Sequence, residues 1–284
     1  MGDFSVLLSV YEKEKAPYLK EALESVLYQS VSPDEILLVE DGPLPLELKE
    51  TIAAFEKNCQ SSGRGTSFRV VSLERNQGLG PALAEGLKSS RNELVARMDT
   101  DDIAEPDRFE KQLEYLCAHP EIAACGGFLQ EFTEEDPSYS RIKEMPETPE
   151  ALRKYARFRN PLNHMTVMFR KSAVLAAGNY RSCPLLEDYD LWIRMLAQGA
   201  AFYNLQQVLV RMRTGNSFSA RRGGWDYFQV YKGLRKMQKE YGLLSVGEYL
   251  LSLLFTFGMT VQPKWMRHAA YRLFLRKDAS RSKN

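Results

Sequence analysis

The sequence has little cysteine, little net charge and no long apolar run, and each shortage excludes a class of protein. Its four cysteines form neither a Cys-x-x-Cys pair nor a zinc-binding spacing, so we expect free thiols in a reducing compartment. A net charge of +1 argues against nucleic-acid binding through bulk electrostatics. The longest C-terminal apolar stretch, Tyr249–Val261, is shorter than the roughly 20 residues that a membrane-spanning helix needs. These shortages predict a cytoplasmic protein with no nucleic-acid partner.

The residues that are present suit a large α/β domain, with or without an appendage. Apolar residues make up 44% of the chain and charged residues 26%, as in ordinary globular proteins. The first apolar run follows Asp3 and precedes no small-residue cleavage site, so it predicts a strand rather than a signal peptide. In the first half of the chain we expect strands over Phe4–Val10, Ile36–Val39, Phe68–Leu73 and Leu94–Met98. The expected helices are Pro17–Leu27, Leu46–Asn58 and a short helix that runs through Leu87.

Polar residues follow each of these four strands, namely Tyr11, Asp41, Asn76 and Asp99. Strands that alternate with helices at this spacing indicate βαβ units on a mostly parallel sheet. Ligands bind such a sheet outside the carboxyl ends of its strands. The four residues should therefore converge on one edge of the sheet.

Three carboxylates, Asp99, Asp101 and Asp102, end the fourth strand. If the chain stays extended there, Asp99 and Asp101 leave the same face about 7 Å apart. One carboxylate could then hold Mg²⁺ or Mn²⁺, which prefer oxygen ligands, while the other takes a sugar hydroxyl or a water. The alternative is an acidic turn that caps a helix beginning at Pro106.

The second half of the chain has a less regular pattern. Expected helices are Pro106–His119, Pro149–Arg157, Lys171–Ala177 and a helix from Glu187 to about Gln198. Expected strands are Glu121–Phe132 with a break at Gly126-Gly127, His164–Phe169, Phe202–Asn204 and Gln207–Met212. Expected loops are Pro137–Pro149 and Arg213–Gly224.

From Trp225 onward the pattern is helical and the charge becomes basic. Between residues 264 and 283 seven lysines and arginines stand against Asp278 alone, with Trp265, Tyr271 and Phe274 among them. Aromatic and basic residues beside a short apolar helix favour attachment to an anionic membrane surface. The alternative is a helix packed on the domain with a solvated basic face. We therefore divide the chain at residue 224, before a basic helical segment 225–284.

Four short motifs together resemble the inverting family 2 glycosyltransferases of the GT-A fold. The resemblance covers about residues 4–215, and it is closest to bacterial members that build O-antigen, capsule and exopolysaccharide. It implies a Rossmann-like, mostly parallel sheet flanked by helices, with a nucleotide-binding half (1–110), an acceptor half (111–224) and a C-terminal helical appendage. The motifs are Ser9-Val10-Tyr11, Glu40-Asp41-Gly42, Asp99-Thr100-Asp101-Asp102 and Glu187-Asp188.

The resemblance implies a binding site for a UDP-sugar in the first half. Ser9 and Tyr11 would line the uracil pocket, and Asp41 would accept a hydrogen bond from the uracil N3–H. A carboxylate suits that role because it only accepts hydrogen bonds. Asn76 and Gly78 would lie where the family's loop passes the nucleotide.

The resemblance also implies the roles of the acidic residues. Asp99 would meet the ribose or sugar hydroxyls, and Asp101 would hold the Mg²⁺ or Mn²⁺ that bridges the diphosphate. Asp188 would be the general base that takes the proton from the acceptor hydroxyl. Charge at a helix start, which Asp190 supplies equally well, is the alternative explanation of the acidic cluster.

One position departs from the family pattern. Many members carry a histidine in an Arg-x-His segment after the last strand, and here the matching stretch is Arg211-Met212-Arg213. Arg213, with Arg221 and Arg222, could instead neutralise the leaving diphosphate, because guanidinium pairs well with phosphate oxygens. His164 is a second candidate ligand near the site.

We therefore expect a metal-dependent hexosyltransferase on the inner face of the cell membrane. Its donor would be a UDP-sugar, and its acceptor a lipid-diphosphate-linked oligosaccharide. A sugar nucleotidyltransferase would need a glycine-rich loop after the first strand, where Tyr11–Lys15 contains no glycine. The sequence leaves open two further hypotheses, a non-catalytic nucleotide-binding scaffold and a two-carboxylate hydrolase.

Overall fold

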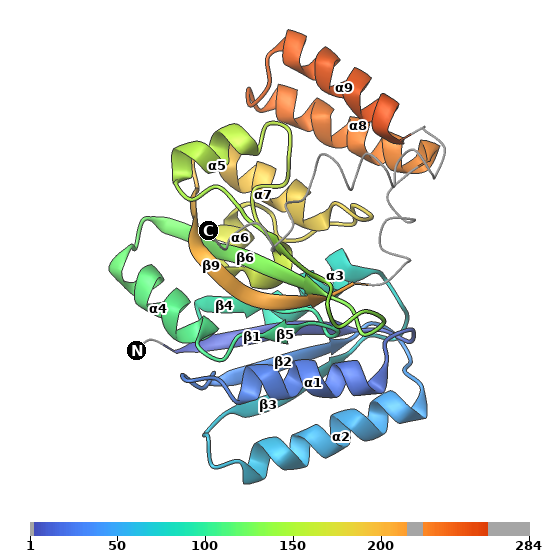
Figure 1. Cartoon of the computed structure of the whole chain (residues 1–284), viewed down its shortest axis with the longest axis vertical. Coiled ribbons are helices and arrows are strands. Elements are labelled where there is room, and N and C mark those ends of the chain that lie inside the picture. The colour runs from blue at the N-terminus through green and yellow to red at the C-terminus, as the bar shows by residue number, and fades with distance from the viewer. Residues whose placement is uncertain (1–2, 215–223, 261–284) are drawn as a thin grey trace.

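A nine-stranded sheet runs through the part of the chain that the structure describes, with helices on both of its faces (Figure 1). The computed structural model describes residues 3–214 and 224–260. The strand order is β3-β2-β1-β4-β8-β6-β9-β5, and β7 pairs with β6 outside that path. The predicted α/β fold is confirmed.

The first four strands are parallel, as the alternation of strands and helices predicts. From β1 the chain steps outward to β2 and β3 on one side, and β4 then pairs with β1 on its other side. The strand order therefore reverses at β1, which makes the carboxyl end of β1 a topological switch point. These strands span Phe4–Val10 (β1), Glu35–Glu40 (β2), Ser67–Ser72 (β3) and Leu94–Arg97 (β4).

Helices cover both faces of β1, which explains why its residues are apolar apart from Ser5 and Ser9. Phe4, Val6 and Leu8 pack in one core with α1, α2 and α4, and Leu7 packs in the opposite core with α3. Successive side chains of a strand point to opposite faces, so a strand covered on both sides needs apolar residues at every position. The helices span Ala16–Leu27 (α1), Leu46–Ser61 (α2), Leu79–Ser89 (α3) and Arg108–Ala118 (α4).

The second half of the sheet is mixed. Strand β8 is antiparallel to both β4 and β6, β9 is parallel to β6, and the short strands β5 and β7 are antiparallel to their neighbours. The bounds are Ile103–Ala104 (β5), Ile122–Phe132 (β6), Ser140–Lys143 (β7), Met168–Arg170 (β8) and Ala201–Arg213 (β9), with helices Pro149–Tyr155 (α5), Lys171–Ala176 (α6) and Glu187–Ala197 (α7).

The strand predicted over His164–Phe169 is wrong at its start. His164–Thr166 forms a 3₁₀ turn, and β8 begins only at Met168. The hydroxyl of Thr166 donates to the carbonyl of Asn163 at 2.8 Å. A bond of this kind from side chain to backbone favours a turn over an extended chain.

Three further predictions in the second half need correction. Strand β6 is continuous through the expected break at Gly126-Gly127, and the two strands expected after residue 201 are the single strand β9. The glycines instead mark irregular pairing, because the register between β6 and β9 shifts after Gly127. The position also has no room for a side chain, since a Cβ on Gly127 would lie 2.5 Å from Leu209 Cδ1. The expected loop Pro137–Pro149 contains β7, whose polar residues show no strand periodicity.

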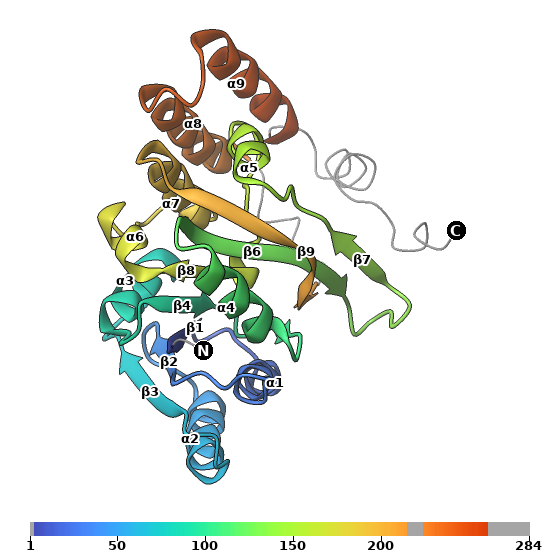
Figure 2. The ribbon, with the colours of Figure 1, turned by 90° about the vertical axis from the view of Figure 1, so that its left-hand side faces the viewer.

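The C-terminal helices α8 (Trp225–Glu240) and α9 (Val246–Thr260) lie beyond α5 and α7, at the end of the molecule away from α2 (Figure 2). Arg235 of α8 donates to the carbonyl of Phe158 at 2.7 Å, and Gln238 donates to that of Ala156 at 2.7 Å. These carbonyls follow α5, and the last carbonyls of a helix have no partner within it. The predicted helical appendage is confirmed through α9, and the basic residues 264–283 lie outside the described residues.

Candidate active site

The structure brings four of the predicted site segments to one edge of the sheet. Ser9 and Tyr11 stand at the end of β1, and Asp41, Asn76 and Asp99 follow β2, β3 and β4. Because these four strands are parallel and adjacent, their carboxyl ends meet at the same edge. The predicted convergence is therefore confirmed.

Asp41 fastens the loop that follows β3. Its carboxylate accepts hydrogen bonds from the backbone N–H groups of Gln77, at 2.7 Å, and Gly78, at 2.9 Å. Gly42 has a φ of +88°, and a Cβ there would lie 2.5 Å from the nitrogen of Asn76. The Glu-Asp-Gly motif thus joins the loop after β2 to the loop after β3, through the carboxylate of Asp41 and through the close approach of Gly42 to the backbone of Asn76. Each carboxylate oxygen can accept a second bond, so a further role for Asp41 toward a bound base stays a prediction.

The aspartates after β4 converge because the chain turns. Ligand oxygens of Asp99, Asp101 and Asp102 all lie within 4.8 Å of one another. The extended course predicted for this segment is therefore wrong, since residues 100 and 101 form a turn. The hydroxyl of Thr100 contacts the carboxylate of Glu14 at 2.9 Å and the carbonyl of Ser9 at 3.3 Å, which ties this turn to the end of β1.

The crowded aspartates resist ionisation. Burial and the charges of Asp99 and Glu14 raise the pKa of Asp101 to about 7, and burial with the two neighbouring carboxylates raises the pKa of Asp102. Asp102 accepts a hydrogen bond from the N–H of Arg213 at 2.9 Å, while its Oδ2 has no hydrogen-bond partner in the described ranges. Converging hard oxygens with an unsatisfied buried atom fit a divalent cation such as Mg²⁺ or Mn²⁺.

Arg97 is a member of this site that the sequence prediction missed. It is the last residue of β4, its guanidinium is buried, and it forms an ion pair with Asp99. Its Nε and Nη1 have no hydrogen-bond partner within residues 3–214 and 224–260. The signal in the sequence was a charged residue inside an apolar strand, because such a residue needs a buried partner.

Arg213, at the end of β9, makes contacts that the sequence did not suggest. Its guanidinium lies 4.0 Å from the ring centre of Tyr18 and forms ion pairs with Glu21 and Glu134. Its Nε donates to the carbonyl of Asp101 at 3.1 Å. Arg213 thus fixes the aspartate turn from the other half of the sheet, and its role toward a diphosphate stays a prediction. Its expected helpers Arg221 and Arg222 lie outside the described residues.

The first turn of α7 carries Asp188 and Asp190 in different environments. Asp188 accepts hydrogen bonds from the amide of Asn160 and from the N–H of Tyr189. Asp190 is buried and accepts two bonds from Arg194, at 2.6 and 2.9 Å. Asp190 therefore neutralises a buried arginine within the helix, and this leaves Asp188 as the stronger candidate for a base.

Buried polar residues connect α7 with the aspartate cluster. Burial raises the pKa of the Tyr180 hydroxyl, the charge of Arg97 opposes this, and the charges of Asp188 and Asp99 add to it. His164 shares a hydrogen bond of 2.9 Å with that hydroxyl, and burial together with Arg97 lowers the pKa of His164. The structure thus places His164 in this buried network.

Gly80 allows the segment before α7 to approach α3. A Cβ on Gly80 would lie 2.2 Å from the carbonyl oxygen of Arg181 and 3.1 Å from Cγ of Glu187. Any other residue at this position would push the start of α7 away from the loop that carries Gly78. The Gly-x-Gly spacing of that loop was the available sequence signal.

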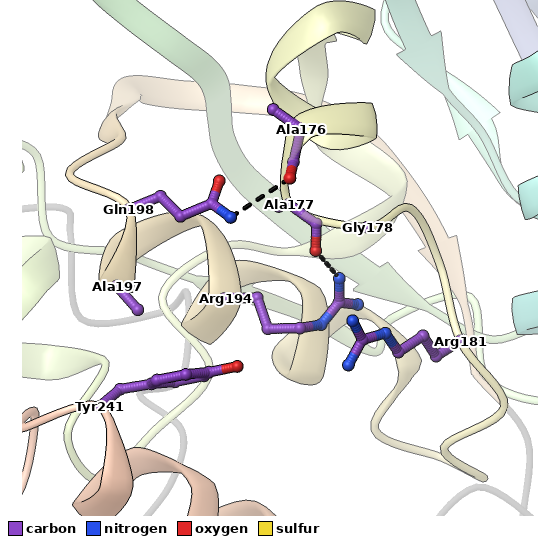
Figure 3. A pocket seen from close by; sticks show the side chains of 8 residues that line it. All are labelled: Ala176, Ala177, Gly178, Arg181, Arg194, Ala197, Gln198 and Tyr241. Atoms are coloured by element: carbon purple, nitrogen blue, oxygen red, sulfur yellow. Dashed lines mark hydrogen bonds between the residues drawn. The ribbon is translucent and has the colours of Figure 1, made fainter.

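A hollow of about 260 Å³ lies elsewhere, between α6, α7 and the end of α8 (Figure 3). Arg194 donates to the carbonyl of Ala177 there, and Gln198 donates to that of Ala176 at 3.2 Å. Tyr241 closes the hollow from the C-terminal helices. It contains none of the predicted site residues and marks the seam between the sheet domain and the appendage.

The parallel half-sheet, its reversal at β1 and the carboxylates at that edge define an α/β enzyme of the GT-A fold. A crystal structure of S. aureus TarS 1–349 in complex with UDP-GlcNAc matches 96% of this chain and 76% of that chain, with a TM-score of 0.68 and 16% identity. A mannosyltransferase from Pyrobaculum calidifontis, in complex with GDP-Man and Mn²⁺, matches 95% of this chain and 79% of its own with a TM-score of 0.58 and 13% identity.

The family model described as glycosyl transferase family 2 matches residues 5–175. The chain belongs to that family, as its motifs suggested. It is 39% identical to the amylovoran biosynthesis glycosyltransferase AmsE of Erwinia amylovora, over 91% of this chain and 95% of the relative. It is 31% identical to an Escherichia coli UDP-Gal:alpha-D-GlcNAc-diphosphoundecaprenol beta-1,3-galactosyltransferase, over 96% of this chain and 97% of the relative.

Proposed function

We propose that this glycosyltransferase moves a hexose from a UDP-sugar to a lipid-diphosphate-linked oligosaccharide, with inversion, in the synthesis of a bacterial surface polysaccharide. The observation that carries the proposal is the cluster of Asp99, Asp101 and Asp102 after β4, at the edge of the sheet where Asp41 holds the loop after β3. The names of the Erwinia amylovora and Escherichia coli relatives support the pathway and the acceptor class.

The nucleotide would lie over the carboxyl ends of β1, β2 and β3. Ser9 and Tyr11 would flank the uracil, with Tyr11 already 37% exposed at that edge. Asp41 would accept from the uracil N3–H with the lone pairs that its two backbone bonds leave. Asn76 and Gly78 would border the nucleotide, because Asp41 holds their loop against the site.

The diphosphate would lie over the aspartate turn. Asp101 and Asp102 would hold a Mg²⁺ or Mn²⁺ ion, and Asp99 would meet sugar or ribose hydroxyls from its ion pair with Arg97. When bound, the ion supplies positive charge that stabilises the leaving diphosphate. Arg213 would keep the turn in place and would reach a phosphate oxygen only by leaving Glu21 or Glu134.

Asp188 would act as the general base. An acceptor hydroxyl is a poor nucleophile, and a carboxylate that removes its proton as the new bond forms speeds the attack. The hydroxyl would attack the anomeric carbon opposite the diphosphate, so a single displacement inverts that centre. The Asn160 amide and the Tyr189 N–H fix the direction of the Asp188 carboxylate. No covalent intermediate is required.

The acceptor would reach this site at the inner face of the cell membrane. A lipid-diphosphate carries its glycan at the bilayer surface, so the enzyme would work at that surface. No helix within residues 3–214 and 224–260 is long and apolar enough to cross a bilayer. The basic segment 264–283 would contribute attraction to anionic lipids.

Release of UDP from a panel of UDP-sugars with Mn²⁺ tests the proposed function. Slow donor hydrolysis can be observed without knowing the acceptor. We expect turnover with one UDP-sugar and its loss in Asp101→Ala. If the wild type released no UDP from any UDP-sugar and also showed no measurable UDP binding, the nucleotide assignment would be refuted.

A further inference from the structure

The helix α9 turns its apolar side chains toward solvent. Leu254 and Phe255 are each 71% exposed, although buried leucine and phenylalanine dominate the core elsewhere. The exposed side chains recur at helical spacing, so they form one continuous face. We call this surface the outer face of α9; its members are Val246, Leu250, Leu251, Leu254, Phe255 and Phe257.

The inner side of the same helix carries small polar residues. Ser252 and Thr256 are buried on the side that packs on the protein, four residues apart. An ordinary surface helix has the reverse arrangement, with apolar residues inward and polar residues outward. The outer face of α9 is therefore apolar where an ordinary surface helix is polar.

The appendage holds this face firmly on the domain. Glu248 of α9 forms an ion pair with Arg157, and the ring of Phe257 lies 5.4 Å from that of Phe228 in α8. In α8, Arg235 and Gln238 hydrogen-bond the carbonyls that follow α5. The outer face of α9 is therefore an exposed apolar surface on a packed helix.

We infer that the outer face of α9 inserts into the surface layer of an anionic lipid bilayer. At 15 residues, α9 is about 22 Å long, enough to lie in the interface and too short to span the bilayer. The 24 residues that follow it contain seven lysines and arginines and one aspartate, which complements anionic headgroups. Apolar insertion and adjacent basic charge together are the two signals that stable attachment requires.

This inference deepens the proposed function, because a lipid-linked acceptor lies at the same surface. The Nη1 atom of Arg235 lies 3.3 Å from the Tyr189 hydroxyl, and Tyr189 follows Asp188 in α7. The helix pair that carries the outer face of α9 is thus packed next to the helix that carries the proposed base. Insertion of α9 would hold the acceptor site at a fixed height above the bilayer.

Co-sedimentation of the full chain with lipid vesicles tests the inference. One vesicle contains phosphatidylglycerol and phosphatidylcholine, and the other contains phosphatidylcholine alone. We expect binding to the anionic vesicle and at least about tenfold weaker binding by the double variant Leu254→Gln/Phe255→Gln, since each side chain loses a large apolar contact. The matched control is Leu46→Gln on α2, where the leucine is also 71% exposed, and it should bind as the wild type does.

Three results would overturn the inference. The wild type could fail to bind the anionic vesicle, or the double variant could bind as tightly as the wild type. The third is a wild type that is a dimer in solution and a double variant that is a monomer. That result would assign the outer face of α9 to a second copy of the chain. UDP release is measured separately on the same proteins and should be equal in wild type and double variant. A protein that binds vesicles but neither binds UDP nor releases it from any UDP-sugar would refute the proposed function and leave this inference standing.

Discussion

At the scale of single residues, the site depends on one buried arginine among three carboxylates. Arg97 pairs with Asp99, yet burial and the charges of Asp99 and Glu14 raise the pKa of Asp101, and burial with the charges of Asp101 and Asp99 raises the pKa of Asp102. Removal of one of these carboxylates should therefore relieve electrostatic repulsion in the metal-free protein. The same removal should weaken the binding of a divalent cation, because the cation needs the ionised oxygens.

The variant Asp101→Asn tests this balance. Asp101 has a pKa of about 7 in the folded protein against an ordinary 3.8, so the folded form binds its proton more tightly than the unfolded form does. The contribution of Asp101 to the stability of the metal-free wild type should then fall as pH rises from 3.8 to about 7. We expect Asp101→Asn to melt at a higher temperature than the wild type at pH 8 without metal, and to lose the stabilisation by Mn²⁺. Equal pH profiles for the two proteins would contradict the assignment.

The variant Gly42→Ala tests the contact between the loops after β2 and β3. A Cβ on Gly42 would lie 2.5 Å from the Asn76 nitrogen, whereas Gly63, also at positive φ, has open space around it. We expect Gly63→Ala to cost about 1 kcal/mol from backbone strain. Gly42→Ala should cost about 2 kcal/mol more, from overpacking, and should weaken UDP binding. Chemical denaturation and UDP titration measure both effects, and equal losses of stability in the two variants would argue against the close approach.

At the scale of secondary-structure elements, Glu35 joins three parts of the nucleotide-binding half. It is buried at the start of β2 and accepts hydrogen bonds from Ser5 of β1 at 2.7 Å, from the N–H of Arg91 at 2.9 Å and from Arg69 of β3. Burial opposes its ionisation, but these hydrogen bonds and the charge of Arg69 together lower the pKa of Glu35. The ionised form therefore stabilises the alignment of β1, β2 and β3.

The variant Glu35→Gln should destabilise the protein by about 2 kcal/mol at pH 7, because it removes a buried charged acceptor of hydrogen bonds from Ser5, Arg69 and the Arg91 N–H. Because the pKa is lowered on folding, this stabilisation is present above pH 4.5 and is lost as pH falls through the folded-state value. The free energy of unfolding of the variant, measured by urea denaturation, should therefore fall less steeply than that of the wild type as the pH is lowered. Glu85→Gln is the control, since Glu85 pairs with Lys88 at the surface and should contribute under 1 kcal/mol. Equal effects of the two substitutions would contradict this role of Glu35.

The elements that sequence predicts well are those buried on both faces. Strands β1, β2 and β4 are mostly apolar on both faces because both faces are buried. Strand β7 is polar and is held by its backbone pairing with β6 rather than by burial. Its sequence therefore has no apolar periodicity from which a strand could be predicted. The turn over His164–Thr166 depends on a local bond from Thr166, which an apolar count does not detect.

At the scale of the whole molecule, the site is assembled from both halves of the chain. The first half contributes the carboxylates after β2 and β4, and the second half contributes the hydrogen bonds of Arg213 to the aspartate turn and the proposed base Asp188. The motifs named the aspartates in advance because each stands beside a strand end. The bond from Arg213 to Asp102 joins residues 111 positions apart, and such contacts follow from the packing of the sheet and cannot be read from either segment alone.

The most direct test of this account is to measure UDP affinity and sugar transfer separately in Asp188→Asn. Asparagine keeps the size of the side chain and one acceptor oxygen, so it retains one of the two bonds from Asn160 and the Tyr189 N–H, but it cannot take a proton. We predict that Kd for UDP with Mn²⁺ stays within about twofold of the wild type while kcat falls about 10²- to 10⁴-fold. A variant that transfers sugar at the wild-type rate, or one that loses UDP binding together with turnover, would contradict the placement of the base on α7.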